Sequence, residues 1–164
     1  MRSLLFVMFA ALALAGCDAS GMPGASPFDP GALANGNTPS PHDAMAKAQN
    51  NFRERNFGLA EQQYRKLVED QPKNADAWLG LGSVHDELGR FDLADLDYAQ
   101  VKKLSGTTPE LLNDRGYSYM LRGDFARSRR LFLRARAMDP TNTFIVNNLH
   151  ILAEREAQKR PSKS

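Results

Sequence analysis

The sequence has a single cysteine in 164 residues, so the chain cannot form a disulfide bond within itself. Its charges nearly cancel: 21 Lys and Arg oppose 19 Asp and Glu, and the net charge of +2 gives no sign of a strongly polyanionic partner. The one long apolar run, Leu4 to Ala15, is shorter than the ~20 residues that a transmembrane helix requires. With 42% hydrophobic and 24% charged residues, the composition is that of one ordinary globular domain of modest size.

The apolar run has the features of a secretory signal sequence, because Arg2 places a positive charge ahead of it. It ends in Leu14-Ala15-Gly16-Cys17, which resembles the lipobox of bacterial lipoproteins. This resemblance implies a signal peptide over residues 1–16, cleavage before Cys17, and acyl chains such as palmitate on the sulfur and new amino group of Cys17. The alternative is a free thiol in an uncleaved N-terminal segment.

Residues 17–40 are predicted to form a disordered tether. Four glycines and four prolines lie between Asp18 and Ser40, with few large apolar side chains, so this segment cannot bury enough surface to offset its ordering entropy. As a flexible coil it would span ~25 Å, which would let a folded domain stand off a membrane and reach a partner.

Aromatic residues recur every 34 residues through the rest of the chain. The two series are Phe57, Phe91, Phe125 and Tyr64, Tyr98, Phe132. Ser40-Pro41 and Thr108-Pro109 are typical helix starts, and apolar residues follow them at helical spacing. The pattern predicts three pairs of short amphipathic helices, each pair joined by a tight turn.

The second unit carries the clearest motif: Trp78, Leu81, Gly82, Gly89, Phe91, Ala94 and Tyr98. Its spacing and the 34-residue period resemble the tetratricopeptide repeat (TPR) family. The resemblance implies an all-α fold, an α-solenoid of about three helix-turn-helix repeats. Its expected parts are repeats at 41–74, 75–108 and 109–142, a capping helix at 143–159 and a frayed tail at 160–164. The first repeat departs from the pattern: Lys47-Ala48 stands where the second repeat has Leu81-Gly82, and Arg55 stands where it has Gly89.

No pattern of residues indicates catalysis. The three histidines fall in different units, and they are His42, His85 and His150. Three acids of the second unit do not share one helix face and are predicted to form a solvated acidic surface: Asp92, Asp95 and Asp97. Arg122-Gly123-Asp124 is predicted to be an interhelix turn rather than an adhesion motif. We therefore expect no enzyme activity, no cofactor and no metal site.

Charge differs between the units. Residues 75–108 hold six acids and three bases, whereas residues 109–142 hold four acids and seven arginines. The arginines cluster on the predicted second helix of the third unit. This cluster is either a solvated convex face or a docking face for an acidic partner.

In the TPR family the first helices of the repeats line a concave groove that holds ligands. Carried onto this sequence, the resemblance implies a partner-binding set of Met45, Gln49, Phe52, Asp76, Leu79, Ser83, Asp86, Glu87, Asn113, Tyr117, Met120 and Leu121. The set mixes apolar and acidic groups, which suits an extended or helical peptide with apolar anchors and one or two basic residues. The alternative is that several of these side chains only pack against neighbouring helices.

The lipobox, the tether, the three repeats and Asn147-Asn148-Leu149 together resemble the TadD lipoproteins of tight-adherence (Tad/Flp) pilus assembly systems. That resemblance implies a pilotin-like scaffold for a secretin or pilus component, anchored in the outer membrane and facing the periplasm. Asp18 leaves the membrane open, because in enteric bacteria an aspartate at this position is associated with retention in the inner membrane. The alternatives are a general cell-envelope adaptor, in cell-wall synthesis or outer-membrane assembly, and a ligand-binding domain.

Overall fold

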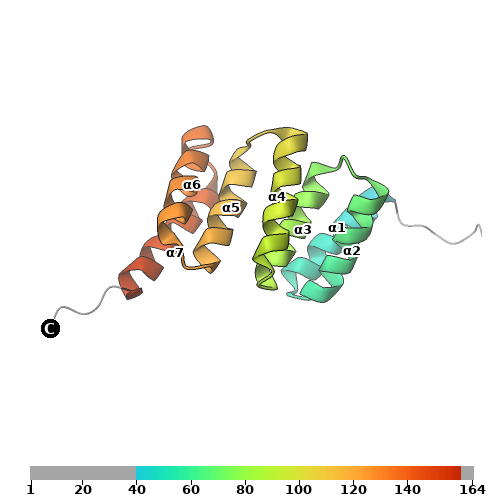
Figure 1. Ribbon diagram of the computed structural model, residues 1–164, viewed down its shortest axis with the longest axis horizontal. Coiled ribbons are helices and arrows are strands. Elements are labelled where there is room, and N and C mark those ends of the chain that lie inside the picture. Colours follow the sequence, from blue (N-terminus) through green and yellow to red (C-terminus); the bar gives the residue numbers. More distant parts are fainter. Residues whose placement is uncertain (1–39, 160–164) are drawn as a thin grey trace, which may run out of the picture. The chain divides into compact units, whose positions relative to one another are not determined.

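The computed structural model describes residues 40–159, which fold into α-helices without a strand (Figure 1). In chain order these are α1 (Pro41–Arg53), α2 (Phe57–Asp70), α3 (Ala75–Glu87), α4 (Phe91–Ser105), α5 (Pro109–Leu121), α6 (Phe125–Met138) and α7 (Thr143–Lys159). The predicted all-α repeat architecture is confirmed for this part of the chain. Between residues 40 and 159, none of the helices combines the length and apolarity needed to cross a bilayer. The predicted signal peptide, Cys17, the tether before Ser40 and the tail at 160–164 lie outside the described residues.

Consecutive helices pair as hairpins, α1 with α2, α3 with α4 and α5 with α6, and α7 packs on α6 (Figure 1). Capping residues set where the first helix of each hairpin begins. The side chains of Ser40, Asn74 and Thr108 each accept a hydrogen bond from the backbone N–H three residues later. These caps satisfy donors that a helix start otherwise leaves unpaired. Proline follows Ser40 and Thr108 at the first helical position, where its missing N–H costs nothing.

The turn inside each hairpin needs one residue in the left-handed backbone region. Gly89 (φ 71°) and Gly123 (φ 77°) fill this position in the second and third hairpins. Arg55 (φ 61°) fills it in the first, where a side chain costs roughly 1–2 kcal/mol. The Arg55 guanidinium lies 5.3 Å from the centroid of the Phe57 ring, a contact that offsets part of this strain. The presence of Arg55 in place of the usual turn glycine therefore strains the turn but leaves the hairpin intact.

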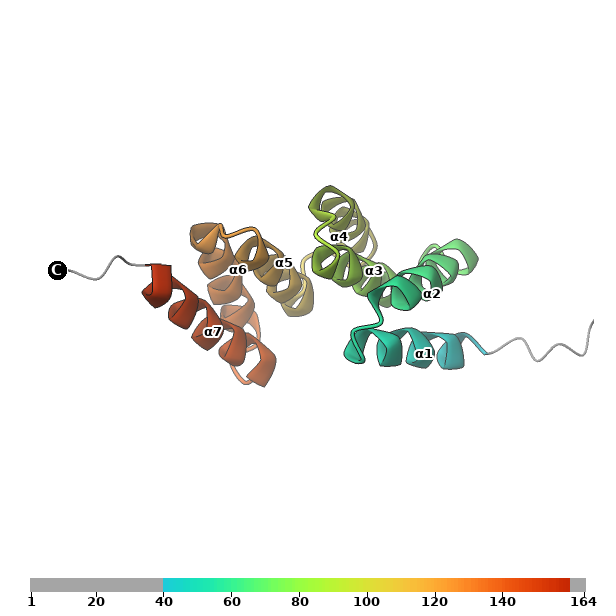
Figure 2. The same ribbon diagram turned by 90° about the horizontal axis from the view of Figure 1, so that it is seen from below.

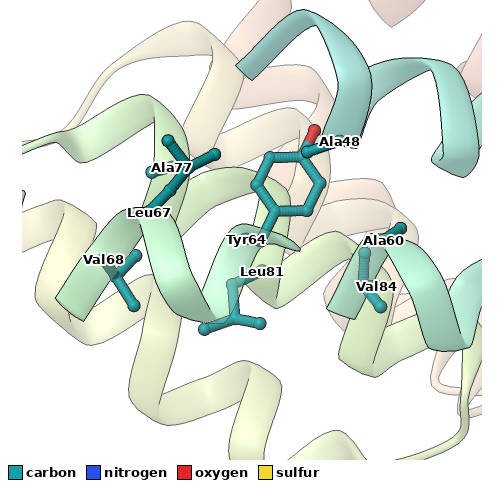
Figure 3. Close-up of a cluster of buried hydrophobic side chains, with 8 residues drawn as sticks. All are labelled: Ala48, Ala60, Tyr64, Leu67, Val68, Ala77, Leu81 and Val84. Atoms are coloured by element: carbon teal, nitrogen blue, oxygen red, sulfur yellow. The ribbon is translucent and has the colours of Figure 1, made fainter. Parts of the chain in front are cut away.

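Each hairpin closes by packing an aromatic ring of its second helix against a small residue of its first. Tyr98 and Phe132 are buried, and they lie so close to Gly82 and Gly116 that a β-carbon at either glycine would come 2.7 Å from a ring carbon. In the first hairpin Tyr64 belongs to a buried cluster that also contains Ala48 (Figure 3). The series Tyr64, Tyr98 and Phe132 thus consists of core residues, as the pattern predicted, whereas the series Phe57, Phe91 and Phe125 is half-buried.

The cluster in Figure 3 also joins the first repeat to the second. Its members come from α1, α2 and α3 and are Ala48, Ala60, Tyr64, Leu67, Val68, Ala77, Leu81 and Val84. Trp78 is half-buried, packs against this cluster and against the next one along the chain, and donates a hydrogen bond from Nε1 to the Pro72 carbonyl at 2.9 Å. One hairpin cannot cover its own apolar face, so each repeat is stabilised by its neighbours.

The prediction of a solvated acidic surface at residues 92–97 is wrong for one of its three members, Asp97. Asp92 is exposed, and the side chain of Asp95 is 41% exposed. Asp97 is buried, and its Oδ2 lies 2.6 Å from Nδ1 of the buried His85. Burial raises the pKa of the Asp97 carboxyl, and the hydrogen bond from His85 opposes that shift. Asp95 is half-buried and receives a two-pronged contact from Arg122, at 2.8 and 2.9 Å.

We predict that Gly116→Ala lowers the free energy of unfolding by about 1–3 kcal/mol, because the added methyl group would collide with the buried Phe132 ring. Gly58→Ala is the matched control, since nothing lies within 4 Å of the position that its β-carbon would take and the change favours helix. Urea denaturation followed by circular dichroism measures both. Equal stability of the two variants would contradict the proposed packing constraint.

Candidate functional site

A hollow opens between the first helices of the three hairpins and α7. Figure 2 shows α1 and α7 on the same side of the stack, with α4 on the opposite side. The hollow has a volume of about 340 Å³. Its lining comes from α1, α3, α4, α5 and α7 and consists of Phe52, Ser83, Glu87, Tyr98, Asn113, Asp114, Tyr117 and Asn148.

A second hollow of about 290 Å³ continues the first toward the start of α7. The two share Asn113, Asp114 and Asn148, and the second adds Leu79, Glu110, Asn142, Phe144 and Ile145. We call the two hollows together the concave groove. Among the described residues that line it there are three carboxylates and neither lysine nor arginine.

Hydrogen bonds hold the polar side chains of the concave groove in place. The Tyr117 hydroxyl donates to Oε1 of Glu87 at 3.1 Å. Asn148 donates to Oδ1 of Asn113 at 2.9 Å, and Asn113 donates to Oδ1 of Asp114 at 3.1 Å. The capping helix α7 therefore orients a groove residue as well as covering the last hairpin. The amide groups offer both donors and acceptors, which is the chemistry needed to bind a peptide backbone.

Asp114 is the most perturbed carboxyl of the groove. Burial raises its pKa to about 6, and the nearby carboxylates of Asp86 and Glu110 act in the same direction. The hydrogen bond from Asn113 opposes the shift. A cationic side chain of a partner would offset both the cost of burying the Asp114 carboxylate and its repulsion by Asp86 and Glu110. The site is therefore electrostatically suited to a basic side chain.

Five of the twelve sequence-predicted groove residues line the first hollow: Phe52, Ser83, Glu87, Asn113 and Tyr117. Leu79 lines the second hollow while also packing against a buried cluster. Met45 packs against the cluster of the first hairpin, and Leu121 is half-buried. Gln49 and Asp76 are exposed on the first helices. These assignments remain predictions of partner contact.

Asp86 and Met120 are buried, with exposed fractions of 3% and 1%, so neither can contact a partner on the surface. Asp86 joins the second and third repeats. It accepts hydrogen bonds from the Ser118 hydroxyl at 2.6 Å and the Tyr98 hydroxyl at 2.7 Å. Burial raises the pKa of Asp86, and these two hydrogen bonds oppose the shift. A charge reversal at Asp86 would therefore test folding rather than binding.

Asp114 and Asn148 line the groove but are not among the sequence-predicted residues. Asp114 lies one position after Asn113, and the family positions do not include it. Asn148 belongs to α7, which was expected only to cap the repeats. Its helical spacing from Ile145 and Leu152, both buried, could have placed it at the edge of the covered face. In residues 40–159, no three His, Cys, Asp or Glu side chains lie where they could share a metal ion.

We predict that Asp114→Asn is more stable than the parent chain at pH 7 and equally stable near pH 3. The folded chain keeps the proton of Asp114 up to about pH 6, whereas in the unfolded chain this carboxyl ionises near its ordinary pKa of 3.8. The contribution of Asp114 to stability is therefore fully present below pH 3.8 and is lost as pH rises from 3.8 through 6. Because Asp114 is partly exposed, we expect only about 1 kcal/mol at pH 7. Urea titrations at both pH values measure the difference. Asp76→Asn, at an exposed acid, is the control, and a pH-independent difference for Asp114→Asn would contradict the prediction.

Solved structures share this arrangement of helices. The first TPR of Spaghetti (RPAP3) bound to the HSP90 peptide SRMEEVD matches with a TM-score of 0.59 and 18% identity, covering 71% of this chain and 93% of that one. The structure of pilF from Pseudomonas aeruginosa matches with a TM-score of 0.60 and 19% identity, covering 72% of this chain and 54% of that one. At these identities the likeness shows the fold alone.

A curated relative matches over a shorter stretch. The bifunctional subunit NrfFG of the formate-dependent nitrite reductase complex of Haemophilus influenzae is 37% identical over 62 residues, which are 38% of this chain and 16% of that protein. The chain thus spans about a sixth of that relative's length. Models of the tetratricopeptide repeat match residues 45–106 and residues 109–142, which together make up more than half of the chain. The chain belongs to the tetratricopeptide repeat family.

Proposed function

We propose that the protein is a non-catalytic interaction scaffold whose concave groove binds a basic segment of a partner protein. The observation that carries this proposal is the lining of the groove: the carboxylates of Glu87, Glu110 and Asp114 with no lysine or arginine among the lining residues. Asparagine amides beside them can pair with a peptide backbone, and Phe52 and Leu79 offer apolar contacts.

The peptide that this groove would prefer is basic, whereas a peptide bound by a structurally similar protein is acidic. The HSP90 peptide SRMEEVD bound by the first TPR of Spaghetti carries three acidic residues. Such a peptide would meet like charges in this groove and would be repelled. A lysine or arginine side chain would instead compensate Glu87 and Asp114. The shared fold therefore supports peptide binding, and the charges of the groove favour a basic peptide.

We predict that a fluorescein-labelled peptide with alternating lysine and leucine binds the purified chain more tightly at pH 7 than at pH 5. Binding strengthens because Asp114 loses its proton as pH rises through about 6. The double variant Glu87→Gln, Asp114→Asn should weaken binding roughly tenfold, since two carboxylates are lost. Fluorescence anisotropy measures both effects. Asp92→Asn, at an exposed acid on α4, is the matched control. Equal affinity for the peptide SRMEEVD, or full retention of binding by the double variant, would refute the groove assignment.

We further propose that this scaffold is a lipid-anchored envelope protein that assists assembly of a Tad/Flp-type pilus or its secretin. The sequence Leu14-Ala15-Gly16-Cys17 supports the anchor, and the combined resemblance of the leader, the repeats and Asn147-Asn148-Leu149 supports the pilus role. A general adaptor in cell-wall synthesis or outer-membrane assembly is the alternative. Asp18 makes the inner membrane an alternative to the outer.

We predict that Cys17→Ser moves the protein from the membrane fraction to the soluble fraction of cells, because the variant has no sulfur to acylate. In a host that builds such pili, the same change should reduce surface piliation. Fractionation and electron microscopy measure the two results. Ser20→Ala is the control for a change in the tether. Membrane retention of Cys17→Ser would refute the anchor, and unchanged piliation after deletion of the gene would refute the pilus role.

A further inference from the structure

The outer side of the third hairpin carries a separate hollow of different chemistry, between α5 and α6. It has a volume of about 300 Å³ and is lined by Arg115, Tyr119, Arg127, Arg130, Leu131 and Arg134. We call it the arginine hollow. Arg127, Arg130 and Arg134 are exposed, whereas Arg115, Tyr119 and Leu131 are half-buried. The hollow therefore has a partly apolar floor and a cationic rim.

Helix geometry places the arginine hollow away from the concave groove. On α5 the groove uses Asn113 and Tyr117, and the arginine hollow uses Arg115 and Tyr119. Residues two apart on an α-helix point about 200° apart around its axis. Positions 127, 130, 131 and 134 of α6 lie on one face at helical spacing. The two sites thus occupy opposite sides of α5.

Three of the four arginines of this hollow lack a carboxylate partner in the described part of the chain. Of the four, only Arg127 has an ion pair within residues 40–159, with Asp124 at 3.3 Å, and α6 contains no acidic residue. Arg115, Arg130 and Arg134 have no acidic oxygen within ion-pair distance in the described part of the chain. Cations gathered around one hollow repel one another, and a bound anion removes that cost. Asp95 of the neighbouring repeat does not relieve it, because this carboxylate pairs with Arg122 instead.

Tyr119 gives the hollow a specific floor. The guanidinium of Arg122 lies 5.0 Å from the centroid of its ring and that of Arg127 lies 5.4 Å away. Arg122 is fixed by its two contacts with Asp95, so the ring has a fixed neighbour on one side. Leu131 lines the same hollow, and Met138, one turn beyond Arg134, is 52% exposed on the same face of α6. An apolar side chain between acidic ones would cover this floor.

We propose that the arginine hollow is a second docking site, which binds an acidic segment of a partner protein through glutamate or aspartate carboxylates around an apolar anchor. Arginine forks match carboxylates in two-pronged geometry. A flat bilayer surface fits less well, because headgroups at a plane would leave the recessed Leu131 and Tyr119 uncovered. With a basic segment in the groove and an acidic segment here, the chain could join two partners at once. This site stands independently of the groove.

The test uses a fluorescein-labelled peptide Glu-Glu-Leu-Glu-Glu and the purified chain, with anisotropy as the readout. We expect saturable binding that weakens as sodium chloride is raised, since the rim is exposed to solvent. The double variant Arg130→Gln, Arg134→Gln should weaken binding roughly tenfold. Arg136→Gln removes the same type of charge from the opposite side of α6 and should change binding less than about twofold. The groove variant Glu87→Gln, Asp114→Asn should retain binding, which separates this site from the proposed function.

Three results would overturn the proposal. The first is no saturable binding of the acidic peptide at low salt. The second is equal weakening by Arg136→Gln, which would show a general charge effect. The third is binding to phosphatidylglycerol vesicles that depends on Arg130 and Arg134, without binding of the peptide, which would assign the hollow to a membrane surface. Circular dichroism of each variant confirms that the helices are retained.

Discussion

The contact between an aromatic ring and a small residue across each hairpin is the constraint on which this structure depends. Tyr98 on Gly82 and Phe132 on Gly116 let the two helices of a hairpin approach closely. That approach buries the ring and leaves the remaining apolar surface on the outside of the pair, where only another repeat can cover it. This contact therefore makes the repeats stack. The stack in turn places the concave groove on one side and the arginine hollow on the other.

Polar side chains then fix how one repeat sits on the next. Asp86 accepts hydrogen bonds from Tyr98 in its own repeat and from Ser118 in the following one. Arg122 reaches back to Asp95 and to the carbonyl of Phe91 at 3.2 Å. Apolar contacts tolerate small slips, whereas these directional bonds do not, since a displaced partner would leave a buried charge unpaired. The groove has a defined shape because these links define the relation of α3 to α5.

The third repeat presents opposite charges on its two sides. Asp114 contributes to an acidic groove, and Arg115, the next residue, contributes to the arginine hollow. This separation is invisible in the net charge of +2, because the two signs cancel over the whole chain. A scaffold with one acidic and one basic face has the electrostatic means to hold two different partners in defined orientation.

The sequence by itself determined the helices, their limits and their pairing, because these features depend on short-range signals. Helix caps at Ser40 and Thr108, glycines at the turns and aromatic residues at a 34-residue period act within one repeat and could be counted directly. The five groove residues that line the first hollow could also be predicted from the sequence, because the ligand-binding positions of the family fall on a known face of each first helix.

Only the tertiary structure decided which charged residues are exposed. Asp86 and Asp97 occupy helix positions that look solvent-facing in the sequence, yet both are buried, and each has a partner on another helix, Ser118 for Asp86 and His85 for Asp97. Asn148 enters the groove because α7 folds back against α5. The physical reason is that burying a carboxylate depends on a donor supplied by a distant segment, and helical periodicity records the face of a residue but not what that face meets.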